Sequence, residues 1–457
     1  MGDWLAKAAS LTIAVLMCAC TGVSSFSTTD RGAVQRGGSA GQTRPTINAG
    51  PPAALGQVRS APRDEGAVKV ALLLPMSGSQ APVGRDLTDA AQIALFDIAA
   101  NNFQMLPYDT NGTPQGAARA AQQALAEGAT MILGPLLSRS VSAVAPIARS
   151  RGVPVVAFSN DLTVAGNGVY TMGFVPQDQV RRVVDYARLQ GIVRFASLVP
   201  NNDYGVAMMQ ALEYAVPRYG AEITDVRFYT FGDPAGAAPI RGMPVAGAEQ
   251  AARELADYDQ RVAALERLRT QLKARDTAQA QAELKRLEIY QTIGEPDFEA
   301  ILLPAGGDDV LRLAPLLAFY DVDPAVVRYL GTWLWDDPTI GAEPTMVGAW
   351  FAAPPPQARV DFIAAFERTY GRMPDRRATL AYDAVAMAAI LAGRPGDRNP
   401  FSQRAMTVPN GFAGTDGIFR LLPSGIVERG LAVLEVQREG LTVRDPAPRS
   451  FGDPLVR

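Results

Sequence analysis

The sequence predicts an α/β protein of two similar lobes, each built on a parallel β-sheet. Apolar runs at 68–75, 131–135 and 153–158 alternate with segments of helical periodicity. Continuous apolar runs are typical of parallel strands that are buried on both faces. A second alternating series follows residue 174, with apolar runs at 195–200, 223–231, 300–304 and 329–333. Two such series in 457 residues match the size of paired α/β domains.

The segments between the strands carry the spacing of amphipathic helices. Leu87, Ala91 and Leu95 fall on one helical face, for example. Several of these segments end at a glycine just before the next strand: Gly128, Gly152, Gly191 and Gly220. Glycine accepts the left-handed conformation that ends a helix, so short connections are expected. Right-handed crossovers then place helices on both faces of each sheet.

Turns of small polar residues follow most of the predicted strands. In open parallel sheets ligands bind at the carboxyl ends of the strands, where helix N-termini present unpaired N–H groups. A ligand cleft is therefore expected at these turns. The alternative at each turn is ordinary turn and capping chemistry, and for Asp161 and Asp203 we favour capping of the element that follows.

The first 19 residues are predicted to be a targeting segment, because their apolar run is too short to span a bilayer. They end in Met17-Cys18-Ala19-Cys20, which resembles the bacterial lipobox. The resemblance implies that Cys20 carries the lipid, palmitate among its acyl chains, and that Thr21 sorts the protein to the outer membrane, facing the periplasm. An ordinary secretory signal is the alternative. Residues 21–67 are rich in Gly, Ser, Thr and Pro and predict a flexible tether.

Composition excludes several classes of chemistry. The chain has no histidine, and its two cysteines, Cys18 and Cys20, lie in the targeting segment. Zinc sites of the Cys/His type, histidine bases and Ser-His-Asp triads are thereby excluded. Arginines are scattered and the net charge is −3, which does not suit nucleic-acid binding. We expect no enzyme activity, no metal and no cofactor; a carboxylate-based enzyme is the weakest of three hypotheses.

Residues 246–292 interrupt the second lobe with a charged helical segment. Leu255, Leu265 and Leu272 belong to a stripe with heptad-like steps, and Ala280 and Leu287 belong to a second stripe after a break at 276–277. Two antiparallel helices would bury these stripes against each other. The hairpin either decorates the lobe or serves as a docking arm for a partner. Replacing 248–291 with a short linker is expected to leave both lobes folded.

The order of several motifs resembles type I periplasmic binding proteins of the branched-chain amino-acid receptor group. These motifs are Pro75-Met76-Ser77-Gly78, Asp97, Asp109-Thr110, Gly134-Pro135-x-x-Ser138, Val153-Pro154-Val155 and Ala381-Tyr382-Asp383-Ala384. The resemblance covers about 68–443. It implies three crossings between the lobes and a ligand cleft lined by the Ser138 and Ser159 turns on one side and the Tyr204 and Gly306 turns on the other.

The candidate cleft residues, including the other strand-end positions, are Ser77, Ser79, Ser138, Ser159, Asn160, Asp161, Tyr204, Gly306 and Trp333. Trp333 and Trp335 can either stack on a sugar or fill the lobe core, and we favour the core. Receptors of the group usually follow the third strand with a small residue and a threonine, whereas this chain has Phe158-Ser159-Asn160-Asp161. We therefore expect weak binding of leucine, isoleucine and valine, or none.

The lipobox, tether, altered turn and insertion together are similar to lipoproteins known as penicillin-binding protein activators. That similarity implies an outer-membrane lipoprotein that binds and activates a peptidoglycan synthase and so regulates cell-wall synthesis. The alternative is a solute-binding lipoprotein of an ABC transporter for amino acids or a related small ligand.

The expected organisation assigns every part of the chain. It comprises a signal peptide at 1–19, a lipidated cysteine and tether at 20–67, a first lobe at 68–174 and about 350–392, a second lobe at 175–349 and about 393–443 with its insertion at 246–292, and a tail at 444–457.

Overall fold

The computed structural model describes residues 67–98, 102–232, 245–337, 339–394, 396 and 399–451. All of these belong to one compact unit of the chain, Pro45–Arg457. The predicted signal segment, Cys20 and nearly all of the predicted tether lie outside the described residues.

The first lobe is built on five parallel strands in the order β2-β1-β3-β4-β5. Its elements are β1 (Val68–Leu74), α1 (Ala81–Ile98), β2 (Phe103–Asp109), α2 (Pro114–Ala126), β3 (Met131–Leu133), α3 (Ser138–Arg149), β4 (Val155–Ala157) and β5 (Val169–Thr171). Successive side chains of β1 point to opposite faces. Leu72 and Leu74 pack with α1 and with α11 (Ala378–Ala392), whereas Ala71 and Leu73 pack with α2 and α3.

The second lobe is built on eight strands in the order β16-β15-β11-β10-β9-β6-β7-β8, of which the six from β11 to β8 are parallel. Its strands are β6 (Arg194–Pro200), β7 (Glu222–Thr230), β8 (Val245–Gly247), β9 (Ala300–Leu302), β10 (Arg328–Gly331), β11 (Trp350–Ala353), β15 (Ala432–Val436) and β16 (Leu441–Asp445). One face of the sheet packs on α4 (Pro176–Leu189) and α5 (Asp203–Ala215). The other packs on α6 (Ala248–Leu255) and α9 (Asp308–Phe319).

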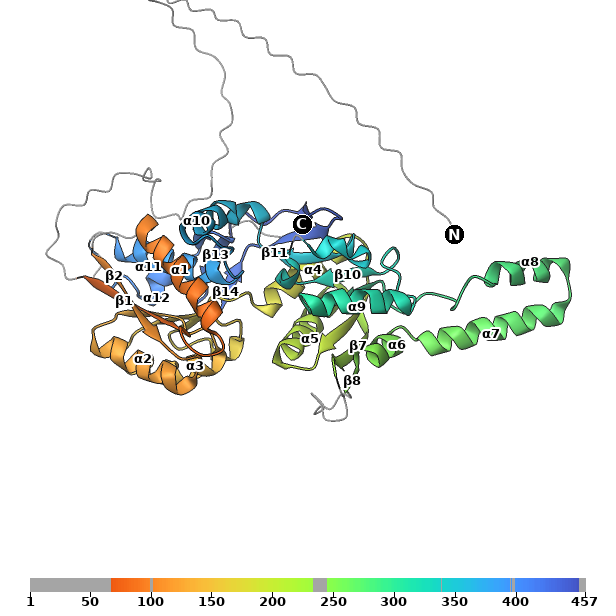
Figure 1. The fold of residues 1–457 in the computed structure, drawn as a ribbon, viewed down its shortest axis with the longest axis horizontal. Coiled ribbons are helices and arrows are strands. Elements are labelled where there is room, and N and C mark those ends of the chain that lie inside the picture. Colours follow the sequence, from red (N-terminus) through yellow and green to blue (C-terminus); the bar gives the residue numbers. More distant parts are fainter. Residues whose placement is uncertain are drawn as a thin grey trace, which may run out of the picture. The chain divides into compact units, whose positions relative to one another are not determined.

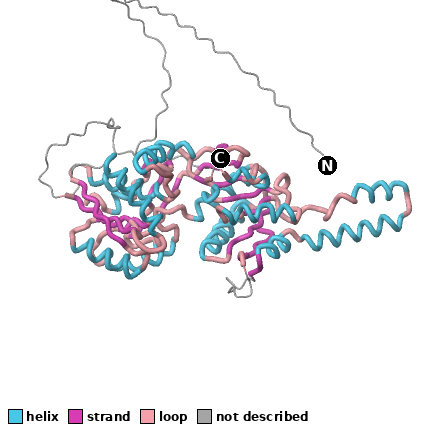
Figure 2. The backbone as a smooth tube through the Cα atoms, in the orientation of Figure 1, coloured by secondary structure: helices cyan, strands magenta, loops and turns pink. Residues whose placement is uncertain are grey.

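Both lobes therefore have the predicted architecture, parallel strands with helices on each face (Figure 2). The four glycines expected to end helices all adopt a positive φ: Gly128 at 88°, Gly152 at 64°, Gly191 at 91° and Gly220 at 66°. A residue with a Cβ would be strained there. A hairpin joins β13 (Gly417–Leu421) and β14 (Val427–Arg429), which pair antiparallel.

The later part of the chain is divided differently from the expected boundaries. β11 was expected in the first lobe but pairs with β10 and β15 of the second sheet. Residues 412–429 were expected in the second lobe, yet β12 (Phe412–Gly414), β13 and β14 form a small sheet that packs into the core of α1 and α11. β16 extends to Asp445, so the expected tail begins within a strand.

The chain passes between the two cores three times. It crosses from β5 to α4, from β11 to α10 (Val360–Tyr370), and from β14 to β15. Three crossings are what the resemblance implies. They bring residues 172–176, 354–359 and 430–431 into the region where the lobes meet.

The insertion is smaller than expected. α6 was expected within it, but Ala251, Ala252 and Leu255 are buried in the core of the second lobe. The helical stripe breaks at Asp257, whose φ is 47°. Only α7 (Tyr258–Arg275) and α8 (Ala278–Leu287) form the hairpin (Figure 1). The two helices pack on each other through a separate apolar cluster.

The hairpin is fastened at its base. The guanidinium of Arg261 donates to the carbonyl oxygens of Gly294 and Asp321, and the Tyr258 ring packs edge-on against Tyr320 at 5.1 Å. Thr277 caps α8 by accepting from the N–H of Ala280. The distal part of the hairpin is therefore a local unit.

Replacing 263–290 with a short Gly/Ser linker should leave the melting temperature nearly unchanged, because the anchor residues stay and loop closure costs only about 0.6 kcal/mol per doubling of length. Replacing 248–291 should instead lower it strongly, because that change also removes the buried face of α6. This corrects the expectation that the longer segment is dispensable. Thermal unfolding followed by circular dichroism tests both variants. Equal melting temperatures of the two variants would contradict the assignment of α6 to the core of the lobe and of 263–290 to a separate unit.

Candidate functional site

The turn after β1 is held by the turn after β2. The Asp109 carboxylate accepts from the Ser77 hydroxyl at 2.5 Å, from the Met76 N–H at 2.9 Å and from the Asn111 N–H at 2.7 Å. Burial opposes ionisation, but these hydrogen bonds prevail and lower the pKa of Asp109. Ser77 thus fastens two strand ends, while Ser79 is exposed.

The turn after β4 is held by hydrogen bonds within the turn itself. Ser159 is buried, and its hydroxyl accepts from the Asp161 N–H at 3.1 Å. Asp161 accepts from the N–H and the hydroxyl of Thr163 at 2.9 and 2.7 Å, so it caps the short helix that follows, as the capping alternative predicts. Asn160 is exposed and Ser138 is half-buried at the start of α3.

Tyr204 and Gly306 in the second lobe support the fold. The Tyr204 ring packs on the core of α4 and α5, its hydroxyl lies 3.2 Å from the Thr332 Oγ1, and burial raises its pKa. A Cβ on Gly306 would lie 2.7 Å from the Cβ of Leu334, so the glycine permits close packing. The cap of α5 is Asn202 rather than Asp203, which corrects the capping expected of Asp203.

The two tryptophans after β10 have different roles. Trp335 is fully buried, and its Nε1–H donates to the Ala305 carbonyl at 2.7 Å, as the core interpretation predicts. Trp333 is half-buried and stacks on Phe174 with ring centroids 4.8 Å apart. Its backbone N–H donates to Gln179 Oε1 at 3.0 Å. Trp333 therefore contacts both cores, at the point where the chain first crosses.

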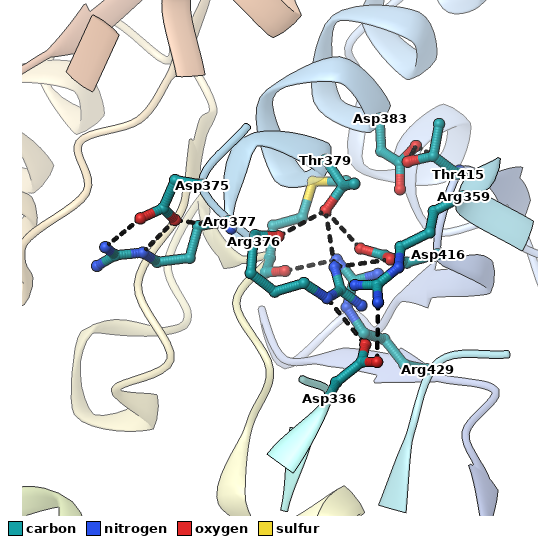
Figure 3. A network of polar contacts seen from close by, with 11 residues as sticks. Asp336, Arg359, Asp375, Arg376, Arg377, Thr379, Asp383, Thr415, Asp416 and Arg429 are labelled. Atoms are coloured by element: carbon teal, nitrogen blue, oxygen red, sulfur yellow. Dashed lines mark hydrogen bonds and ion pairs between the residues drawn. The ribbon is translucent and has the colours of Figure 1, made fainter. Parts of the chain in front are cut away.

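A buried ion-pair cluster lies beside Trp333 (Figure 3). The Asp336 carboxylate, 1% exposed, accepts from Arg359 Nη2 at 2.8 Å and from Arg376 Nε at 3.0 Å. Asp336 follows β10 of the second lobe, whereas Arg376 precedes α11 of the first. One carboxylate thus joins the two lobes and the second crossing.

The cluster continues into the first lobe. Arg376 Nη1 lies 2.9 Å from Asp416 Oδ1, and the hydroxyl of Thr379 donates to Asp416 Oδ2 at 2.5 Å. Asp383, in the middle of the apolar α11, accepts from the N–H and the hydroxyl of Thr415 at 2.7 and 2.8 Å. These contacts tie α11 to the turn between β12 and β13.

Arg429 on β14 completes the cluster from the third crossing. Its Nη2 donates to the Met172 carbonyl at 2.6 Å, and its guanidinium lies 4.8 Å from the Phe174 ring. Its backbone N–H donates to Asp178 Oδ2 at 3.3 Å. The Arg429 side chain is fully desolvated, which lowers its pKa. The nearby Asp416 and Asp383 carboxylates raise that pKa, but desolvation has the larger effect.

Burial also raises the pKa of two carboxylates, Asp383 and Asp178. Desolvation and the neighbouring Asp416 carboxylate raise the pKa of Asp383 to about 7. Desolvation raises the pKa of Asp178 to about 6, although Arg181 and Arg429 oppose it. Near neutral pH the three guanidiniums of Arg359, Arg376 and Arg429 therefore face carboxylates that are not all ionised.

Several polar atoms of the cluster have no hydrogen-bond partner among the described residues. They are Arg376 Nη2, Arg429 Nε and Nη1, Asp383 Oδ2, and Asp416 Oδ1, which is nevertheless ion-paired with Arg376 Nη1. The Arg376 guanidinium also lies 5.3 Å from the Phe174 ring and 5.8 Å from the Trp333 ring. The Nη2 donor of Arg376 is thus buried beside two aromatic rings without an acceptor among the described residues.

The structure thus brings one candidate, Trp333, together with a cluster that the sequence analysis missed. Ser159 and Asp161 make local contacts within their own turn, and Ser77 joins the turns after β1 and β2. The available signal was Asp383, a carboxylate inside the apolar run of α11. A cavity of about 590 Å³ in the second lobe lies between the end of β7, the start of α6 and α9, and none of the candidate residues line it.

The periplasmic binding protein family matches residues 67–440. The chain belongs to this family. A putative branched-chain amino-acid ABC transporter protein of Rhodospirillum rubrum superposes with a TM-score of 0.62 at 18% identity, over 82% of this chain and 99% of that one. A leucine binding protein of Thermotoga maritima gives 0.53 at 20% identity, over 83% and 99%.

A solute binding protein of R. palustris in complex with benzoate gives a TM-score of 0.53 at 18% identity, over 85% of this chain and all of that one. An uncharacterized protein of Rickettsia prowazekii is 22% identical over 174 residues, which are 38% of this chain and 46% of the relative. The chain thus spans about half the length of that relative. These similarities confirm the two-lobe α/β fold of the amino-acid receptor type.

Among the helices that the structure describes, none is long and apolar enough to cross a membrane.

Proposed function

We propose that this protein is a binding protein of the periplasmic type that captures a small carboxylate solute beside Trp333. The observation that carries the proposal is the Arg376 guanidinium, whose buried Nη2 has no hydrogen-bond partner among the described residues and which lies against the rings of Phe174 and Trp333. Trp333 is half-buried at the carboxyl end of a parallel strand, where ligands of such sheets bind.

The neighbouring carboxylates favour a ligand without an ammonium group. Asp336 is neutralised by two guanidiniums, and Asp161 is occupied by Thr163. An ammonium buried here without a carboxylate partner would cost several kcal/mol. The ligands named for two of the similar structures, leucine and benzoate, share a carboxylate, and benzoate lacks the ammonium. An aromatic carboxylate therefore suits this site better than a free amino acid.

Calorimetry with benzoate and with leucine, isoleucine and valine tests the proposal. We expect saturable heat with benzoate, and weak or no binding of the three amino acids. Arg376→Lys keeps the positive charge but removes the planar donor, so it should weaken benzoate binding by about tenfold or more. Arg377→Lys is the matched control, because Arg377 pairs with Asp375 instead.

Two outcomes would contradict the carboxylate proposal. One is the absence of benzoate binding by the wild type at millimolar concentration. The other is tight leucine binding that is lost in Ser138→Ala, which would favour an amino-acid receptor.

A second candidate function is that of an outer-membrane lipoprotein that activates a peptidoglycan synthase. The α7–α8 hairpin favours it, because it packs on its own apolar cluster and keeps charged outer faces such as those of Arg267, Lys273 and Glu283 exposed. Purified penicillin-binding protein should bind the wild type and gain synthase activity. The variant that lacks 263–290 should stay folded and lose this stimulation; retained stimulation would exclude the hairpin as the docking arm.

Lipid attachment to Cys20 is part of this second proposal. Cleavage after Ala19 should leave Cys20 diacylated on its sulfur and acylated on its amine, because its thiol can accept a glyceride. Cys20→Ala should therefore release the protein from the membrane fraction, whereas Cys18→Ala should not. Mass spectrometry of the N-terminus gives the direct measurement, and an unmodified residue 20 would overturn the anchor.

A further inference from the structure

We infer that Asp336 is a latch that fixes the two lobes in one arrangement. Asp336 follows the last turn of the short helix Trp333–Trp335, directly after a strand of the second lobe. Its two partners lie outside that lobe's sheet: Arg359 in the second crossing and Arg376 at the start of α11. The inference does not depend on the proposed ligand.

The partner in the first lobe is itself held in place. Arg376 uses Nε for Asp336 and Nη1 for Asp416, so the guanidinium is fixed from both sides. Asp416 is in turn fixed by the Thr379 hydroxyl of α11. The side chains of Asp336 and Asp416 are 1% and 0% exposed, so solvent screens these pairs little. A hinge rotation at this point cannot carry Arg376 along with the second lobe.

The other two crossings are fastened beside the latch. Gln179 at the start of α4 donates to the carbonyl oxygens of Phe174 and Val175 and accepts from the Trp333 N–H, so the first crossing is tied to the end of β10. Arg429 joins the third crossing to the first through the Met172 carbonyl. All three crossings are thus tied to one another or to residues 333–336.

Opening the lobes would break several contacts at once. The two ion pairs of Asp336 and the stack of Trp333 on Phe174 would separate together. Arg359 and Arg376 would then repel each other without the carboxylate that lies between them. Breaking a buried pair on one side is strongly unfavourable, so one interlobe arrangement should dominate.

Distance measurements between spin labels test the latch. Ser150→Cys on the exposed end of α3 and Gln210→Cys on the exposed face of α5 place one label on each lobe of the full chain, with Cys18 and Cys20 replaced by serine. The parent protein should give one narrow distance distribution. It should stay the same when benzoate is added.

Asp336→Asn should raise the population of other distances by about tenfold or more. Asp337→Asn is the matched control, because Asp337 is exposed and its carboxylate accepts from the N–H and the hydroxyl of Thr339. Arg359→Gln removes only one of the two ion pairs of Asp336. It replaces Asp336→Asn as the test variant if Asp336→Asn does not fold. A parent distribution that is already broad would overturn the latch, and so would an unchanged distribution in both folded variants. Failure of benzoate binding would leave this result unaffected.

Discussion

Trp335→Ala should lower the free energy of unfolding by about 3–5 kcal/mol, the usual cost of truncating a large buried aromatic side chain. The ring is fully buried and packs so closely on Gly331 that a Cβ there would lie 2.2 Å from it. The substitution would leave a cavity and also strand the Ala305 carbonyl that accepts from the indole. Urea denaturation followed by circular dichroism measures the change.

Trp333→Ala is the matched comparison. Trp333 is half-buried and its hydrogen bond uses the backbone N–H, which alanine keeps. Its truncation should therefore cost clearly less stability than that of Trp335, while it should abolish the benzoate response. Equal losses of stability would show that both indoles serve as core.

Asp383→Asn should stabilise the protein at pH 8 and reduce its pH dependence. The pKa of Asp383 is raised to about 7 by burial and by Asp416, well above about 3.9 in an unfolded chain. The native state therefore binds this proton more tightly. The stabilisation is fully present below about pH 4 and is lost as the pH rises through about 7. Asparagine keeps the acceptor for Thr415 and carries no charge at the buried Oδ2 position, which has no partner among the described residues.

The difference in unfolding free energy between wild type and Asp383→Asn, measured from pH 4 to pH 8, should grow in favour of the variant as the pH rises. For Asp375→Asn the pH dependence of this difference in unfolding free energy should have the opposite sign. Burial opposes ionisation of Asp375, but hydrogen bonds from Arg377 lower its pKa. Its contribution is present above about pH 4 and is lost on acidification. A wild-type advantage over Asp383→Asn that grows toward pH 8 would contradict the proposed protonation.

The elements of the fold could be predicted because their signals are local. Runs such as 68–74 and glycines such as Gly128 specify strands and helix ends through burial and backbone conformation. The sheet to which a strand belongs could not be predicted in this way, because strand pairing joins distant parts of the sequence. Trp350 pairs with Glu435, 85 residues away, and nothing within 350–353 indicates that partner. The boundaries after residue 349 were wrong for this reason.

The insertion shows the same limit on a smaller scale. Leu255 continues the stripe of α7 in sequence, but the left-handed turn at Asp257 directs α6 into the lobe core. Asparagine and aspartate tolerate that conformation in many contexts, so the break could not be distinguished from one more helical residue.

The ion-pair cluster could not be assembled from the sequence. Asp336, Arg359, Arg376, Asp416 and Arg429 are far apart in the chain, and a lone charged residue usually marks a solvated surface. The candidate serines, by contrast, stood out through turn chemistry: Ser159 bonds within its own turn, and Ser77 bonds to Asp109 of the neighbouring turn. Among the charged residues near the cluster, Asp383 alone carries a signal in the sequence. It stands in a helix that is apolar on every face, where an acidic residue is unusual.

The final strands of the chain complete both lobes. β12–β14 enter the first core, and β15 and β16 extend the second sheet. During synthesis, neither lobe can therefore close until nearly the entire polypeptide has left the ribosome, since its stabilising contacts join distant parts of the sequence. A nascent chain that stays open for so long remains available to chaperones. A stop codon before residue 412 would accordingly leave two incomplete cores rather than one intact lobe.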